Sequence, residues 1–458
     1  MSVASNPIQQ RMELLAEKWE AAVSTPGVQI VRIHAEESEK DMVDTFCTYL
    51  LGIDTPNKDI PVIFESIYHD DEQYSRDILD ELRKLIEIWN TANKDAVSIR
   101  TEPIAWEVNY SLTKKDNPAF VFVENMNRLA NYLSLGNGIY LIAILRVSFV
   151  EPLQFYRWLE YVVKAGMHDK FKLLIYDTSS NPFFDKIAGK FPEEIITLYP
   201  ELDMDNAMQQ VAAMGNPNDP AVQYRQAFIK LMQAIEKRKE SDAQQWADNC
   251  IDIAINNLEK NPYWIGQVIA VYAALANDQV GYKNYGKAIR FANEGIDAAQ
   301  QSKSLIRDEF IYRKFIAQAV MLRASLYTVN KDWELAVKDF ETAADHYLFT
   351  NDTILAMEAC RMAGYCNQKY GDINAACKWL SKAIECSRQI PAHIVKYTTF
   401  AGIIEMLIEI NNERFVSREE VEAIAEQVYG NDWMKEVLNW KKPHYEQVND
   451  PSQAVIGE

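Results

Sequence analysis

The second half of the chain repeats itself. Residues 330–347 (NKDWELAVKDFETAADHY) and 370–387 (YGDINAACKWLSKAIECS) align at a separation of 40 residues. Each copy has a turn residue, an apolar residue, an alanine three positions on, a bulky apolar residue four later, and a second alanine after three more. These positions hold Trp333, Ala336, Phe340 and Ala343 in the first copy, and Ile373, Ala376, Leu380 and Ala383 in the second. The pattern predicts pairs of helices that stack one on the next.

A weaker copy lies upstream, at residues 282–299. It supplies Tyr285, Ala288 and Ala292, 48 residues before the Trp333 copy. Small alanines let the two helices of a pair approach closely, and the bulky residues fill the space between successive pairs. We therefore expect an all-α helical-repeat domain over residues 219–441.

The pattern resembles the tetratricopeptide repeat. Ala324 and Gly364 stand at the small position of the first helix of a pair, and Tyr327 stands at its aromatic position. The resemblance covers residues 241–390, about three to four units, and the period exceeds the usual value of about 34 residues. It therefore implies longer helices than are typical of the family.

In tetratricopeptide arrays the first helix of each pair lines a groove. The resemblance places Gln318, Met321, Ser325, Thr328, Glu358, Arg361, Tyr365, Gln368 and Lys369 in that groove. This mixed lining suits a peptide or helix of a partner protein. Arg361 and Tyr365 replace the Lys and Asn of the family's carboxylate clamp, so we do not expect chaperone C-terminal tails as ligands. The alternative is a groove filled by the protein's own terminal helix or by its first half.

Strands and helices alternate in the first half of the chain. Strands are expected at 28–34, 60–67, 97–101, 138–149, 171–177 and 194–198, and helices at 36–51, 72–91, 118–134, 151–166 and 203–213. Several strands are almost wholly apolar, which is typical of a parallel sheet covered on both faces. The prediction is an α/β sandwich with a mostly parallel sheet.

Four segments follow from these patterns. We expect an N-terminal helix in 1–26, an α/β domain in 27–213, the repeats in 219–441 and a tail in 442–458, with a linker or turn at 214–223. A capping box that begins at Ser417 predicts a last helix that ends before Gly430.

The first strand-to-helix junction carries three glutamates, Glu36, Glu37 and Glu39, and no glycine until Gly52. A phosphate loop needs glycines and a lysine. A phosphate about 6 Å from each carboxylate would meet a repulsion of roughly 1–3 kcal/mol per pair. The first half weakly resembles a P-loop-type α/β domain in its strand order and in Asp177 at the end of a strand, but it lacks the Walker A loop. We therefore expect no nucleotide hydrolysis.

Acidic residues at other strand ends have two interpretations. Asp177 could act as the acidic second motif of an ATPase, and Asp70 and Asp71 could bind a divalent metal. We favour helix caps or turn residues in each case, and also for Asp203 or Asp205.

Composition limits the partners. The net charge of −19 argues against nucleic acid. The longest apolar stretch, YLIAILRVSFV, is too short to span a membrane, and no signal peptide is evident. We expect a cytoplasmic protein whose six cysteines are small buried residues in helices.

The favoured hypothesis is a non-enzymatic adaptor or chaperone without a cofactor that holds a partner protein, for example the effector or toxin cargo of a bacterial secretion system. One alternative is a nucleotide-responsive regulatory protein with a degenerate NTPase-like domain. A second is a metal-dependent hydrolase that uses Asp70, Asp71 and Asp177.

Overall fold

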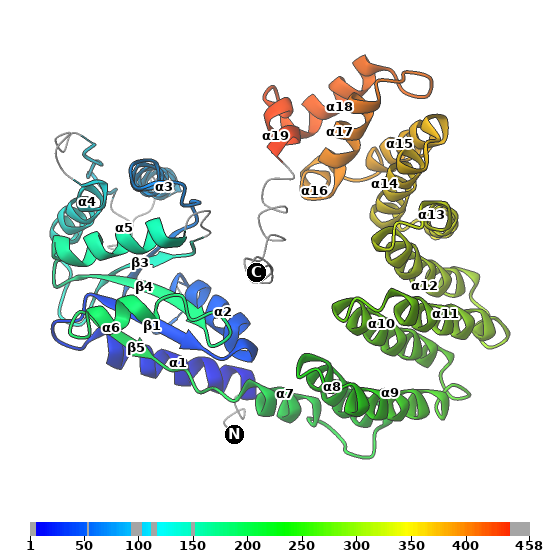
Figure 1. The fold of residues 1–458 in the computed structure, drawn as a ribbon, viewed down its shortest axis with the longest axis horizontal. Helices are drawn as coiled ribbons and strands as arrows, with labels where there is room; N and C mark the ends of the chain where they lie inside the picture. The colour runs from blue at the N-terminus through cyan, green and yellow to red at the C-terminus, as the bar shows by residue number, and fades with distance from the viewer. Residues whose placement is uncertain (1–5, 53–54, 93–102, 111–116, 148–151, 440–458) are drawn as a thin grey trace, which may run out of the picture. The chain divides into compact units, whose positions relative to one another are not determined.

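The computed structural model describes residues 6–52, 55–92, 103–110, 117–147 and 152–439 (Figure 1). The chain forms two compact units, Met1–Val211 and Ala212–Glu458. The first is an α/β unit, and the second consists of helices that follow one another along the chain. The fold class expected from the sequence is confirmed.

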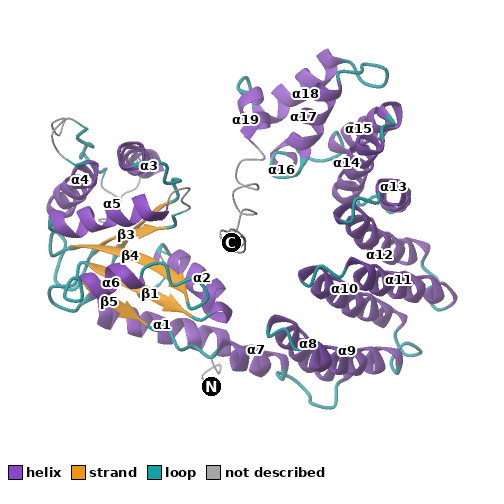
Figure 2. Ribbon diagram, viewed as in Figure 1, coloured by secondary structure: helices purple, strands orange, loops and turns teal. Residues whose placement is uncertain are grey.

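The first unit is built on a parallel five-stranded sheet (Figure 2). The strands are β1 (Ile30–Ala35), β2 (Ile60–Phe64), β3 (Leu141–Leu145), β4 (Phe171–Thr178) and β5 (Ile195–Leu198). Their order in the sheet is β2-β3-β4-β1-β5. Ile30 of β1 pairs with Leu173 of β4 on one side and Ile195 of β5 on the other.

Helices cover both faces of this sheet. Two helices, α1 (Pro7–Val23) and α2 (Lys40–Leu50), pack on the face that includes Val31 and Ile33. The helices α3 (Asp71–Ala92), α4 (Pro118–Leu133), α5 (Pro152–Ala165) and α6 (Asp185–Lys190) pack on the face that includes Ile30. Successive strand residues point to opposite faces, and the inner strands β1, β3 and β4 are buried on both sides, whereas the edge strand β2 is mostly partly exposed.

Two of the strands expected in this unit are not found as predicted. The strand expected over 138–149 is shorter, because β3 spans only Leu141–Leu145 and the chain before it forms turns. The strand expected over 97–101 lies outside the described residues. A final helix, α7 (Met204–Ala212), spans the boundary between the units.

The second unit begins with four helix pairs. The first helices of the pairs, here called the A helices, are α8 (Pro220–Glu236), α10 (Ile265–Gly281), α12 (Glu309–Val329) and α14 (Thr353–Tyr370). The second helices, here called the B helices, are α9 (Glu240–Ile255), α11 (Tyr285–Gln301), α13 (Trp333–Phe349) and α15 (Ile373–Ser387). Each helix packs chiefly against its neighbours in sequence, as in a solenoid.

The repeated alanines hold each pair together. Ala336, Ala343, Ala376 and Ala383 are fully buried, and so is Ala288. The α9 helix fits the same spacing with Ala243, Ala247 and Cys250, all buried. The sequence comparison missed this fourth copy because Glu240 replaces the apolar residue of the pattern, Ala247 replaces the bulky residue and Cys250 replaces the second alanine.

Gly364 lies where the two helices of a pair approach closely. A Cβ atom added there would lie 2.7 Å from a side-chain carbon of Leu380 on α15. Ala324, the equivalent residue on α12, is fully buried. The position is therefore small because the B helix leaves no room for more.

The four turns within the pairs share one backbone geometry. Each has a residue with positive φ two positions before the B helix: Arg238 at 53°, Lys283 at 56°, Lys331 at 64° and Gly371 at 100°. The following residue donates its N–H to a carbonyl five positions back, as in the Schellman motif that ends many helices. Glycine is favoured at such a position, yet only the last turn has one.

Four more helices follow in the part of the second unit that is described, up to residue 439: α16 (Ala392–Val395), α17 (Phe400–Ile410), α18 (Arg418–Tyr429) and α19 (Trp433–Asn439). Ser417 caps α18 by accepting the N–H of Glu420, as expected. The expectation that α18 is the last helix is wrong. Gly430 ends it, but Trp433 and Val437 are buried against the preceding helices and hold one further helix in place.

Two smaller expectations are also resolved. The linker expected over 214–223 is shorter, because Asp219 caps α8 and the helix begins at Pro220. All six cysteines are buried and unpaired, and each lies in a helix, as predicted.

Candidate functional site

The first candidate site is the corner after β1. The connection after β1 leads to α2 on one face of the sheet, and the connection after β4 leads to α6 on the other. The two loops diverge, and in open α/β sheets ligands bind in the crevice beside such a divergence. Here, a short 3₁₀ helix, η1 (Glu37–Glu39), precedes α2 and carries the glutamates.

Glu39 is turned inward at this corner and is 3 % exposed. Its Oε2 accepts the N–H of Glu36 at 3.0 Å, which forms one half of a capping box. Its Oε1 accepts the N–H of Leu202, in the segment after β5. This carboxylate therefore satisfies two backbone donors that an external anion would otherwise contact.

The other two glutamates bind the segment that follows β4. Ser179 Oγ donates to Glu36 Oε2 at 2.8 Å, and Ser180 Oγ donates to Glu37 Oε2 at 2.5 Å. The hydrogen bond from Ser180 lowers the pKa of Glu37 below its ordinary value. The divergent loops are thus joined to each other by the chain's own carboxylates.

Asp177, at the end of β4, belongs to a buried ionic cluster. Arg32 Nε and Nη2 donate to its two oxygens at 3.0 and 2.8 Å, and His34 Nδ1 lies 2.8 Å from Oδ1. Arg32 also pairs with Asp185 at 2.7 Å. Phe184 donates its N–H to Asp177 Oδ2 at 2.8 Å, so the expected turn role is present but secondary.

The partner of Asp177 was missed by sequence reasoning. Arg32 lies between the apolar residues Val31 and Ile33 in β1 and is 2 % exposed. An arginine inside a buried strand requires a carboxylate, and that requirement is the signal that could have found the pair. Because Arg32, His34 and a backbone N–H occupy both Asp177 oxygens, this carboxylate is engaged within the protein.

The remaining acidic candidates are bound locally. Asp70 Oδ1 accepts the N–H of Gln73 at 2.9 Å and caps α3, and Asp203 Oδ1 accepts the N–H of Asn206 at 3.4 Å before α7. The cap interpretation is confirmed for both. Asp71 accepts a hydrogen bond from the Tyr68 hydroxyl. No three or more His, Cys, Asp or Glu residues in the described ranges are grouped as metal ligands.

The second candidate site is a face of the A helices. The residues predicted on α12, Gln318, Met321, Ser325 and Thr328, follow the spacing of one helix face, and Glu358, Arg361, Tyr365 and Gln368 occupy the same register on α14. The same register selects Ala270, Ala273, Asn277 and Val280 on α10, and Arg225, Phe228, Met232 and Ile235 on α8. These sixteen positions, with Lys369, are called the A face below.

Exposure varies along the A face. The exposed members are Arg225, Met232, Asn277, Gln318, Ser325 and Lys369. The other members are partly buried, and Met321 and Tyr365 pack against the core. The face therefore combines accessible polar groups with fixed apolar ones.

Arg361 is less available than the sequence suggested. Its Nε and Nη2 donate to both oxygens of Glu358, at 2.7 and 2.6 Å. The hydroxyl of Thr399, just before α17, donates to the same carboxylate. The arginine charge is thus neutralised on its own helix, and Thr399 is a member of this cluster that sequence reasoning missed.

Tyr365 lies beside this ion pair. Its ring meets that of Trp333 edge-on, with 6.1 Å between ring centroids, and the Lys369 ammonium lies 5.4 Å from the Tyr365 centroid. Trp333 is the first residue of α13, so the aromatic pair joins two successive repeats. Thr328 donates to the carbonyl of Ala324 on its own helix.

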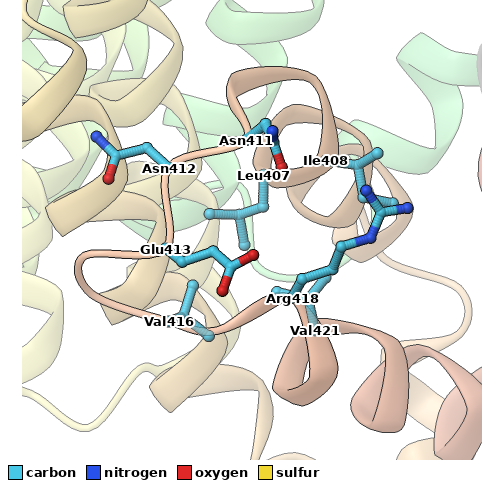
Figure 3. Close-up of a pocket in the computed structure, with 8 residues that line it drawn as sticks. All are labelled: Leu407, Ile408, Asn411, Asn412, Glu413, Val416, Arg418 and Val421. Atoms are coloured by element: carbon cyan, nitrogen blue, oxygen red, sulfur yellow. The ribbon is translucent and has the colours of Figure 1, made fainter.

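A small pocket lies between α17 and α18 (Figure 3). It is lined by Leu407, Ile408, Asn411, Asn412, Glu413, Val416, Arg418 and Val421. Its volume of about 20 Å³ gives room for one or two water molecules. It is too small for a metabolite.

No described helix combines the length and the apolar character that crossing a bilayer requires.

The chain matches no protein-family model, and no curated protein matches it significantly. A solved structure of BtubC (BKLC) from P. vanneervenii is similar at 11 % identity and a TM-score of 0.37, over 52 % of this chain and 90 % of that one.

Two other solved structures match over nearly the full length. The apo form of RapI is similar at 9 % identity and a TM-score of 0.34, over 96 % of this chain and 93 % of that one. A signal transduction ATPase with numerous domains and a tetratricopeptide repeat sensor, from Pyrococcus horikoshii, has 10 % identity and a TM-score of 0.21, over 97 % and 96 %. Scores this low carry no argument about function.

Proposed function

We propose that this protein is a non-enzymatic protein-binding adaptor that holds a partner protein on the A face. The observation that carries the proposal is the repetition of one helix face, in one register, on four successive A helices. A repeated face of this kind offers an extended surface to a peptide or a helix. The spacing of small residues such as Ala324 and Gly364 supports a tetratricopeptide type of array.

The β1 corner supports the non-enzymatic part of the proposal. Its three carboxylates accept hydrogen bonds from Ser179, Ser180 and the N–H of Leu202. A phosphate at this corner would have to displace these donors and would face the carboxylates themselves. We infer that the α/β unit is a degenerate relative of nucleotide-binding domains that serves as a structural part.

A simple measurement separates this proposal from the nucleotide-responsive alternative. Thermal unfolding of the full chain with ATP or GTP and Mg²⁺ should give the same Tm as without nucleotide. A rise of several degrees would mean that the folded state binds the nucleotide, and would favour the alternative.

Capture experiments test the A face directly. Asn277→Trp with Ser325→Trp places two bulky neutral side chains on exposed positions of α10 and α12. Gln300→Trp with Thr342→Trp makes the same change on exposed positions of the B helices α11 and α13. A partner captured from native lysate by the wild type should be lost by the first variant and retained by the second.

Equal capture by both variants would refute the A face as the binding surface. The captured protein, identified by mass spectrometry, also tests a narrower form of the proposal, in which the partner is the effector or toxin cargo of a bacterial secretion system.

A further inference from the structure

Charge is divided unevenly between the two sets of helices. The A helices carry seven Lys or Arg residues against four Asp or Glu residues, whereas the B helices carry five against eleven. The whole chain has a net charge of −19. The A helices thus carry a net charge of +3 within a strongly acidic protein, although Arg313, Lys314, Arg323 and Arg361 are each paired with a carboxylate.

The contrast is sharper on the A face itself. All of its positions lie within the described residues, and Glu358 is the one acidic residue among them. That carboxylate is held by two nitrogens of Arg361 and by the Thr399 hydroxyl. The A face therefore offers a ligand no carboxylate that is not already paired.

Positive charge stands at both ends of the A face. Arg225 on α8 and Lys369 on α14 are exposed. Arg225 donates to the carbonyl of Met214 at 2.7 Å, and Lys369 lies against the ring of Tyr365. Neither residue has a carboxylate among these contacts, so both can attract an anionic group on a ligand.

The middle of the A face is uncharged. Its exposed members, Asn277, Gln318 and Ser325, are polar, and its partly buried members include small and apolar side chains. Ala270 and Ala273 on α10 allow the backbone of a ligand to approach closely, while the partly buried Met321 on α12 offers an apolar contact. Phe228 and Met232 extend the apolar character to α8. A ligand that fits therefore needs apolar side chains as well as acidic ones.

We propose that the A face binds an acidic amphipathic segment of the partner protein. This inference rests on the proposed function and names the chemistry of the partner. The acidic B helices repel the same segment, so the charge distribution of the chain guides it to the A face.

A displayed library of random peptides, selected on the full-length protein, tests the inference. The acidic A-face variant carries Gln318→Glu, Ser325→Glu and Lys369→Glu. The matched control on the B helices carries Gln300→Glu, Thr342→Glu and Lys338→Glu, with the same change of charge at exposed positions. We expect selected peptides with a net negative charge whose binding falls at least tenfold in the A-face variant and less than twofold in the control.

Selected peptides that are neutral or basic, yet lost in the Asn277→Trp and Ser325→Trp variant, would overturn the acidic assignment and leave the proposed function standing. Peptides unaffected by either A-face variant would overturn both. Self-association that the acidic A-face variant abolishes, measured by light scattering over a range of concentrations, would show that the acidic ligand is a second copy of this chain and overturn the assignment to a partner.

Discussion

The β1 corner of the first unit and the A face of the second unit differ in what their polar side chains contact. At the corner, Glu36, Glu37 and Glu39 each accept a hydrogen bond from a distant part of the same chain. On the A face, Gln318 and Ser325 remain exposed about two turns apart on one helix. A polar side chain that is hydrogen-bonded within the protein contributes to the stability of the fold. An exposed polar side chain at a repeated position can instead bind a partner.

The comparison predicts that the first unit depends on its internal ion pairs. Asp177→Ala removes the buried carboxylate from Arg32 and leaves it Asp185, whose side chain is 61 % exposed, so the free energy of unfolding of this unit should fall by up to about 3–5 kcal/mol. Chemical denaturation, followed by a probe in the first unit, measures the change. The exposed Glu193→Ala is the control and should change stability by less than about 0.5 kcal/mol.

Replacing both members of the pair sharpens this test. Arg32→Leu with Asp177→Leu should cost less than the two single changes added together, because neither of the two buried charges is left without its partner. Additive losses would show that the two side chains act independently.

The second unit should depend on close helix packing. Gly364→Ala places a methyl group 2.7 Å from the Leu380 side chain and 3.3 Å from the carbonyl oxygen of Ala376. Overpacking outweighs the better helix propensity of alanine, and we expect a loss of about 1–2 kcal/mol in the free energy of unfolding. Gly281→Ala, which meets no atom within 4 Å, should instead stabilise the protein. Similar effects of the two substitutions would contradict close packing as the reason for Gly364.

Introducing a glycine into one repeat turn and removing the glycine from another should change the stability of the protein in opposite directions. Lys331 has a φ of 64°, so Lys331→Gly relieves backbone strain and should raise stability by about 0.5–1 kcal/mol. Gly371→Ala, at a φ of 100°, should lower it by a similar amount. Thermal unfolding of both variants gives the signs, and a destabilised Lys331→Gly protein would argue against strain at this turn.

The smallest expected effect concerns pH at the corner. The pKa of Glu37 is lowered in the folded state by the hydrogen bond from Ser180, so its contribution to stability is present at neutral pH and is lost as the pH falls through that lowered value. Because Glu37 is exposed, Glu37→Gln should cost less than about 0.5 kcal/mol at pH 7. The difference from wild type should shrink below about pH 4. A difference that stays constant across this range would exclude the Glu37 charge as its source.

Local patterns predicted much of the fold. The alanine spacing located α13 and α15, because a helix repeats its face every few residues and the pattern needs no distant contact. The same logic found the caps Asp70, Asp203 and Ser417. The local pattern did not predict α19. This helix is held in place because Trp433 and Val437 are buried against the preceding helices.

The A face was predicted only in part. Residues on α12 and α14 followed from the repeat, but the equivalent positions on α8 and α10 were missed because their repeats diverge in sequence. The pairing of Arg361 with Glu358 lies within one helix and could have been read from its spacing. The hydroxyl of Thr399, 41 residues from Glu358, could not.

The sequence by itself determined the α/β half, the helical repeat and the negative charge at the first strand-to-helix corner, because these depend on residues close together in the chain. Only the tertiary structure decided what those charges do. Asp177 is 145 residues from Arg32, and Ser179 is 143 residues from Glu36. Hydrogen bonds over such separations exist only once the sheet has brought the strand ends together.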